Sequence, residues 1–218
     1  MKKESALKGL GVFFIFVGIL SIATAVREGR FEEVIWVCYA GTLLMGLGFL
    51  FGWRGIARAQ MNILFIIWVL WTVDALLFLF GIEWLGISSY LFLNRGAVLT
   101  FISLQHIYGL VLGILGIWLM GSDGANRVKK KESEGVKSGS KGDREGWGSA
   151  WKLSLIEMGL IFILSRLFTP VERNLNCVFR SCISGVLEGI SVAGWVLVWV
   201  AVVIVGVLFV DYGFRRLF

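Results

Sequence analysis

The sequence predicts an all-α, polytopic integral membrane protein, a bundle of six transmembrane helices, and three observations carry this prediction. Of the 218 residues, 57% are hydrophobic and only 17% are charged, whereas soluble domains have about 45–50% apolar and about 25% charged residues. The apolar residues stand in long blocks, and a helix that is apolar on all sides is either deeply buried or in lipid. A chain this short cannot bury several such helices in its own interior, so lipid is the better solvent for them.

Six apolar segments are long enough, or nearly so, to cross a hydrocarbon core of ~30 Å at ~1.5 Å per residue. They are residues 9–26, 34–53, 63–82, 97–120, 153–169 and 192–210. The fifth is the weakest, because it is short, contains Glu157 and Arg166, and ends at Pro170, the only proline. Its alternative is an amphipathic helix that lies at the membrane interface.

The distribution of Lys and Arg predicts the orientation. Six spans divide the loops into two sets: the N-terminus, 54–62, 121–152 and the C-terminus on one side, and the remaining connections on the other. The first set contains fifteen basic residues and the second contains six. Cytoplasmic loops carry an excess of Lys and Arg, so both termini are expected in the cytoplasm, and the membrane is expected to be the plasma membrane. The net charge of +6 is therefore attributed to membrane topology and to anionic headgroups, not to nucleic acid.

The first span has a second interpretation. A basic start, an apolar middle and the sequence Ala23-Thr24-Ala25 also resemble a signal peptide with a cleavage site. An uncleaved first helix is favoured, because the apolar run reaches spanning length and further spans follow it. Both interpretations give the rest of the chain the same orientation.

Residues 121–152 are expected to form a flexible, disordered basic linker in the cytoplasm, since Gly, Ser, Lys and Glu dominate there. Its charge would attract anionic lipid headgroups. The linker divides the chain into a four-helix part, residues 1–120, and a two-helix part, residues 153–218, with the outer loop 170–191 between its helices.

Two ionisable residues lie deep in apolar segments. Asp74 is placed in the third span, in the stretch WTVDALLFLFG, and His106, the only histidine, in the fourth. Topology places both at a similar depth in the outer half of the membrane, and a short connection makes the two helices neighbours. Because an ionisable group at mid-membrane costs ~2.5–3.5 kcal/mol on insertion scales, each is expected to be the other's partner. They are too few for a metal site, since zinc needs three or more protein ligands.

Glycine stripes on two spans predict close helix contacts. His106, Gly109, Gly113 and Gly116 follow one face of the fourth span, and Cys38, Gly41, Met45, Gly48 and Gly52 follow one face of the second. Both stripes contain a GxxxG pattern, which lets backbones approach closely. The contact is expected within the bundle, with a partner helix, or with a second copy of the chain.

The outer loop 170–191 is expected to contain a short amphipathic helix with Asn176 as its N-cap, because apolar residues recur every four positions from Val178 to Ile190. In such a helix Cys177 and Cys182 would lie too far apart for a disulfide. A non-helical loop would permit that bridge, and Cys177 to Cys38 is another option. Three free thiols are the favoured expectation.

Two functional hypotheses follow. In the first, an outward-facing intramembrane pocket uses Asp74 and His106 to bind a small ligand or relay protons, with Arg166 and Asn176 at its mouth. In the second, the protein is a structural or assembly component of a membrane complex, and Asp74 and His106 are only a packing clasp. No phosphate loop, HExxH, GxSxG or CxxC motif occurs, so the sequence assigns no catalytic residue and no cofactor.

Overall fold

The computed structural model describes residues 2–92, 96–133, 149–182 and 189–217. Every regular element in these ranges is helical, which confirms the predicted all-α class. The elements are α1 (Lys2–Arg27), η1 (Phe31–Ile35), α2 (Val37–Phe51), α3 (Arg54–Leu79), η2 (Ser89–Phe92), α4 (Ala97–Ser103), α5 (Gln105–Ser133), α7 (Ala150–Phe168), η3 (Leu175–Cys177) and α8 (Val192–Leu217).

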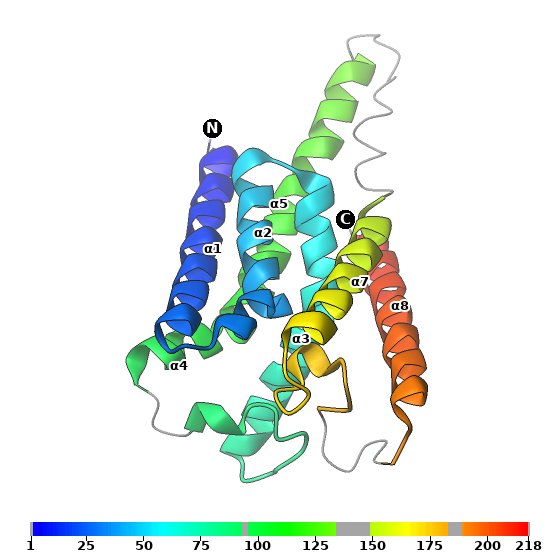
Figure 1. Cartoon of the computed structure of the whole chain (residues 1–218). Coiled ribbons are helices and arrows are strands. Elements are labelled where there is room, and N and C mark those ends of the chain that lie inside the picture. Colours follow the sequence, from blue (N-terminus) through cyan, green and yellow to red (C-terminus); the bar gives the residue numbers. More distant parts are fainter. Residues whose placement is uncertain (1, 93–95, 134–148, 183–188, 218) are drawn as a thin grey trace.

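The long helices run up and down one bundle, so the connections gather at its two ends (Figure 1). Both termini, the turn at Gly52 and the far half of α5 lie at one end. Elements η1, η2, α4 and η3 lie at the other. Helix α3 is central, because it packs against α2, α5, α7 and α8. The described parts of the two sets of loops that the sequence separated by charge therefore lie at opposite ends of the bundle. We call these ends the basic end and the outer end, names taken from the predicted topology.

The prediction of six spans is not supported by the described helices. Three helices are long and apolar enough to cross a membrane: Lys3–Arg27, Arg54–Leu79 and Val192–Leu217. A fourth is reached if Ala97–Ser103 and Gln105–Gly121, bent by 43° at their junction, count as one span. Helix α2 has only 15 residues, about 22 Å at ~1.5 Å per residue. The predicted span 34–53 is shortened because Val34 and Ile35 belong to the 3-10 turn η1 and the helix ends at Phe51. Helix α7 has 19 residues but contains Lys152, Glu157 and Arg166.

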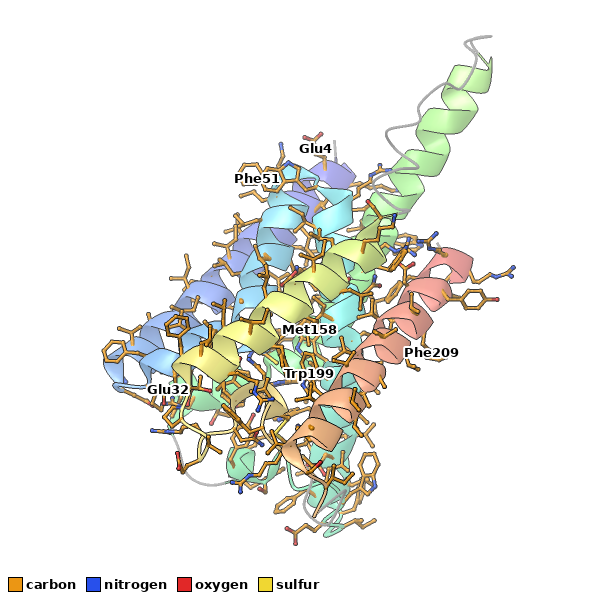
Figure 2. All side chains as sticks on the ribbon, turned by 45° about the vertical axis from the view of Figure 1, so that its right-hand side comes forward. Glu4, Glu32, Phe51, Met158, Trp199 and Phe209 are labelled. Carbon is orange, nitrogen blue, oxygen red and sulfur yellow. A yellow bond between two sulfur atoms is a disulfide. The ribbon has the colours of Figure 1, made fainter. Side chains whose placement is uncertain are left out.

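The apolar side chains that face outward are typical of a lipid-facing surface. Leu197 and Phe209 on α8 are 72% and 71% exposed, and large apolar residues on α1, α3 and α7 are also exposed. Figure 2 shows Phe209 pointing away from the bundle, whereas Trp199 on the same helix points inward towards α7. A surface this apolar favours lipid over water as its surroundings.

The glycine stripe on α5 packs against α2 and α3, which confirms the predicted helix–helix interface. A Cβ added at Gly109 would lie 2.9 Å from the ring of Trp68, and one at Gly116 would lie within the ring of Phe49. On α2, a Cβ at Gly48 would lie 2.8 Å from the backbone nitrogen of Ala57 on α3. Gly41 and Gly48 of the α2 stripe and Gly109, Gly113 and Gly116 of the α5 stripe contact the chain's own helices. Contact of the stripes with a partner helix or a second copy stays a prediction.

The sequence did not predict the tightest contact between helices, which joins α1 and α2. A Cβ at Gly11 would lie 2.6 Å from the backbone nitrogen of Leu50, and one at Gly46 would lie 2.6 Å from that of Ile15. The two backbones thus approach through small residues on both helices, as in other close membrane helix pairs. The single GxxxG criterion missed this contact because the two glycines belong to different helices.

The predicted amphipathic helix after Asn176 is wrong for the part of the loop that is described. Residues 175–177 form one 3-10 turn, and residues 178–182 are not helical. Asn174, Asn176 and Cys177 have φ values of 43°, 54° and 57°, in the left-handed region that interrupts a helix. The remaining positions of the predicted helix, 183–188, lie outside the described residues.

The predicted linker begins later than expected. Helix α5 continues to Ser133, and α7 begins at Ala150, so the ends of the expected linker 121–152 are helical. Its central part, residues 134–148, lies outside the described residues, and its predicted disorder stays a prediction.

Candidate functional site

Asp74 does not pair with His106, which corrects the expectation from sequence. The Leu85 and Gly86 N–H groups donate to Asp74 Oδ1 at 2.7 and 3.1 Å. The Ser88 N–H and hydroxyl donate to Oδ2 at 2.8 and 2.7 Å. The carboxylate therefore binds the loop that follows its own helix, which offers four donors where an imidazole offers one.

His106 lies just after the break between α4 and α5 and binds across it. Its Nδ1 lies 2.7 Å from the carbonyl oxygen of Ser103, so Nδ1 carries the hydrogen and donates to one of the carbonyls left unpaired where α4 ends. The imidazole also stacks on the indole of Trp71, with ring centres 4.5 Å apart and planes 18° apart. His106 is therefore fixed at the bend, which explains why a single polar residue stands there.

Trp71 connects the two predicted site residues indirectly. It lies one helical turn before Asp74 on α3, and its indole N–H donates to the hydroxyl of Tyr90 at 3.0 Å. Tyr90 belongs to η2, directly after the loop that Asp74 holds. The outer end of α3 is thus joined to η2 by hydrogen bonds and to α5 by a stacked ring.

Asn176 joins three elements at the outer end. Its Nδ2 donates to the carbonyl oxygen of Ile35 at 3.0 Å and to the Ser165 hydroxyl at 2.9 Å. Its Oδ1 accepts from the Val37 N–H at 3.0 Å. The one side chain therefore binds the start of α2 and the end of α7, and its amide oxygen and nitrogen are both occupied.

Arg166 contacts aromatic rings. Its guanidinium lies 5.4 Å from the ring centre of Phe162 and 5.0 Å from that of Phe179, within the range of a cation–π contact. The structure thus places Arg166 and Asn176 in one region, around η3, and Asp74 and His106 in another, around η2. It does not bring the four residues together in one pocket.

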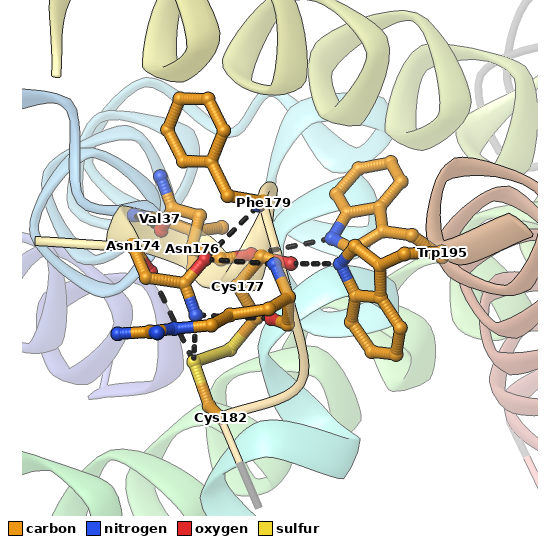
Figure 3. Close-up of a disulfide and its surroundings, with 9 residues drawn as sticks. Val37, Asn174, Asn176, Cys177, Phe179, Cys182 and Trp195 are labelled. Atoms are coloured by element: carbon orange, nitrogen blue, oxygen red, sulfur yellow. Dashed lines mark hydrogen bonds between the residues drawn. A yellow bond between two sulfur atoms is a disulfide. The ribbon is translucent and has the colours of Figure 1, made fainter. Parts of the chain in front are cut away.

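A disulfide between Cys177 and Cys182 closes the outer loop, contrary to the expectation of three free thiols (Figure 3). The Cα atoms are 5.4 Å apart, which the non-helical backbone allows. Cys38 is the free cysteine of the described residues and is buried in α2. The Asn174 amide oxygen accepts from the N–H groups of Phe179 and Arg180 at 3.0 and 3.1 Å, inside the ring that the disulfide closes.

Two tryptophans of α8 hold this loop against the bundle. The indole N–H of Trp195 donates to the carbonyl oxygen of Cys177 at 2.8 Å, and that of Trp199 donates to the carbonyl oxygen of Asn176 at 3.2 Å. Figure 3 shows Trp195 reaching towards the loop from α8. Residues 174–182, which contain the disulfide and which we call the disulfide loop, are therefore bound to α2, α7 and α8.

Charged residues at the start of η1 complete the outer end. Arg30 Nη1 donates to both carboxylate oxygens of Glu33, at 2.7 and 2.6 Å. Burial raises the pKa of Glu33, and the arginine opposes this shift only in part. Arg173 of the outer loop forms an ion pair with Glu32 at 3.2 Å. This ion pair also connects η1 to the outer loop.

A polar network near the basic end was missed at the sequence level. Arg58 on α3 is 1% exposed, and its Nε and Nη2 donate to the side chain and carbonyl oxygen of Asp211 on α8. Asn62 Nδ2 donates to the same carboxylate at 3.1 Å, and Arg215 Nε donates to it at 2.6 Å. Treating residues 54–62 as a loop hid this network. The spacing of four between Arg58 and Asn62, and between Asp211 and Arg215, was the available signal.

The described residues contain no group of three or more His, Cys, Asp or Glu side chains that could hold a metal ion. No family model, curated protein or solved structure matches the chain. The arrangement of its own residues is therefore the basis for assigning a function.

Proposed function

We propose that the chain is a plasma-membrane protein that acts as a structural or assembly component of a membrane complex. In this proposal the whole bundle lies in lipid, α2 and α7 included, so the chain passes the membrane six times. Both termini are cytoplasmic, and the basic end contacts anionic headgroups. The disulfide loop, η1 and η2 form a rigid outer face.

The charges and the disulfide support this orientation independently. The described parts of the predicted cytoplasmic set, which are the two ends of the chain, the start of α3, the far half of α5 and the start of α7, lie at one end of the bundle. The turn η3, which ends at Cys177 of the disulfide, lies at the other end. Disulfides persist in oxidising compartments and are rare in the cytosol, so an outer end outside the cytoplasm agrees with both observations.

The assembly role rests on one observation: the polar residues proposed for a site are already bound to other parts of the chain. Asp74 accepts four hydrogen bonds from its own chain, and Asn176 makes three between elements. His106 binds across the helix break, and Arg166 packs on two rings. A ligand pocket or proton relay at these residues would have to break contacts that hold the fold.

The test separates folding from chemistry at His106. Quantitative proteomics of membranes from cells with and without the protein identifies membrane proteins whose amount depends on it, and their amount is the readout. The variant His106→Gln keeps an amide N–H that can donate to Ser103 but cannot shuttle a proton. An assembly component in this variant should restore the dependent proteins in full. A folded His106→Gln protein that restores none of them would refute the proposal.

A further inference from the structure

Helices α3 and α7 are joined near the basic end by a contact between an amide and a carboxyl group. Gln60 Nε2 lies 2.6 Å from Glu157 Oε2. Gln60 is 1% exposed and fits there because residue 41 of α2 is glycine, where an added Cβ would lie 3.1 Å from Gln60 Oε1. The pair therefore lies where α2, α3 and α7 meet.

The amide oxygen of Gln60 and the second carboxylate oxygen of Glu157 are buried without a hydrogen-bond partner. Gln60 Oε1 and Glu157 Oε1 both lack a donor within the described structure. If Glu157 is ionised, both atoms are acceptors, and neither can satisfy the other. Each buried polar atom left unpaired costs about 1–3 kcal/mol, and more when it is charged.

No cation among the described residues pairs with this carboxylate. Helix α7 packs against α3, α8, η1 and η3. Besides Glu157, the charged or titratable residues of these elements and of α7 itself are Arg54, Arg58, Asp74, Asp211, Tyr212, Arg215, Arg216, Glu32, Glu33, Lys152 and Arg166. Of the basic residues, Arg58 and Arg215 bind Asp211, and Arg216 donates to Tyr212. Lys152 and Arg166 lie over the rings of aromatic neighbours.

We infer that Glu157 binds a proton and that Gln60 is the acceptor that holds it. A hydrogen on Glu157 Oε1 turns that atom into a donor, and Gln60 Oε1, on the side chain that already binds Glu157 Oε2, is a buried acceptor without a donor. The amide and the neutral acid then form a closed ring with two hydrogen bonds, Nε2–H to Oε2 and Oε1–H to Oε1. One proton thus satisfies both unpaired oxygens and removes an uncompensated charge from the bundle. The packing of α7 on α3 becomes dependent on this proton.

Infrared spectroscopy of the purified protein in lipid nanodiscs tests the protonation state directly. At neutral pH the wild-type protein should show the carbonyl stretch of a protonated carboxylic acid, and Glu157→Gln should lose it. Asp74→Asn is the matched control: Asp74 accepts four donors, so its carboxylate is ionised and this variant should keep the band. Gln60→Ala should shift the band to higher frequency, because the acid loses its acceptor. A band that is absent from the wild-type protein, or unchanged in both Glu157→Gln and Gln60→Ala, would overturn the inference.

The pH dependence of thermal stability gives a second readout. The folded state would hold a proton that Glu157 releases in the unfolded chain above pH ~4.3. From that pH up to the pH at which folded Glu157 ionises, folding takes up a proton. Stability is therefore greatest at low pH and falls as the pH rises across this interval. In Glu157→Gln the stability should no longer fall with rising pH in this way, while the contact with the Gln60 amide is kept. Stabilisation of the wild-type protein by Na⁺ over choline, lost in Glu157→Gln, would show a cation in place of the proton and refute the inference.

Discussion

The Asp74 carboxylate accepts both the backbone N–H and the hydroxyl of Ser88, at 2.8 and 2.7 Å. With Leu85 and Gly86 bound to the other oxygen, one side chain of α3 fixes the turn that leads to η2. The carboxylate avoids the cost of an unpaired buried charge because its donors come from a loop that would otherwise leave its own N–H groups unpaired.

Asp74→Asn should destabilise the protein by about 2–4 kcal/mol, since hydrogen bonds to a charged group contribute ~1.5–3 kcal/mol each and the new NH₂ group would face donors. Ser88→Ala should cost less, because it removes one of the four bonds. The measurement is denaturant unfolding in detergent micelles, followed by tryptophan fluorescence. In the double variant the two costs should not add, because the residues are in contact. Strict additivity would show that the bond is not formed, and Thr100→Ala, which loses an exposed bond, should change little.

Gly116→Ala should destabilise the bundle by about 1–3 kcal/mol, because the new methyl group would overlap the ring of Phe49, which is 1% exposed. The matched control is Gly159→Ala on α7, where no atom lies within 4 Å of the added Cβ. That change should stabilise the protein by up to about 1 kcal/mol through helix propensity. Thermal unfolding of the two purified variants gives the comparison. Equal effects would mean that α5 does not pack on α2 as described.

The glycine stripe on α5 shows what the helical repeat of a sequence can predict. Its residues repeat with the period of the helix, so the sequence alone places them on one face, and the contact with α2 and α3 follows. Counting residues along two neighbouring helices also places Asp74 and His106 at a similar level of the bundle, and the stacking of His106 on Trp71, one helical turn from Asp74, agrees with this. Their partners do not, because the choice of donor depends on the path of residues 81–92, which no periodicity encodes.

The outer loop shows where periodicity misleads. Apolar residues recur every four positions after Asn176, but this pattern also fits a loop whose apolar side chains point to one side. Asn174, Asn176 and Cys177 have positive φ values. Hydrogen bonds of the Asn174 and Asn176 side-chain amides and of two α8 indoles hold this backbone in place. A local sequence pattern does not encode the contacts from α8. The spacing of four between Arg58 and Asn62 could have placed them on a helix, but their pairing with Asp211 could not be predicted, since 153 residues separate Arg58 from Asp211.

Removing the disulfide with Cys177→Ser and Cys182→Ser should lower stability by about 2 kcal/mol, the value expected for a ring of so few residues. The bonds from Trp195 and Trp199 to the loop should weaken, so tryptophan emission should change as well. In the wild-type protein on intact cells, a membrane-impermeant maleimide should label the loop only after an impermeant reductant. Cys38, which is buried, should stay unlabelled in the folded protein. Labelling that requires inside-out vesicles would place the disulfide loop in the cytoplasm and contradict the proposed orientation.

The pair of Arg58 and Asp211 gives the sharpest test of the packing of α3 against α8. Asp211→Leu removes the carboxylate that binds a guanidinium 1% exposed, so it should cost about 3–5 kcal/mol, the range for breaking a buried ion pair by removing one partner. Arg58→Met should also destabilise, since Asp211 then keeps only Asn62 and Arg215. The double variant should be more stable than Asp211→Leu alone, because neither charge remains buried. Arg216→Ala, at an exposed position of the same helix, should stay within ~0.5 kcal/mol of wild type. Thermal unfolding of the four proteins measures the coupling, and a double variant as unstable as the sum of the singles would exclude the pair.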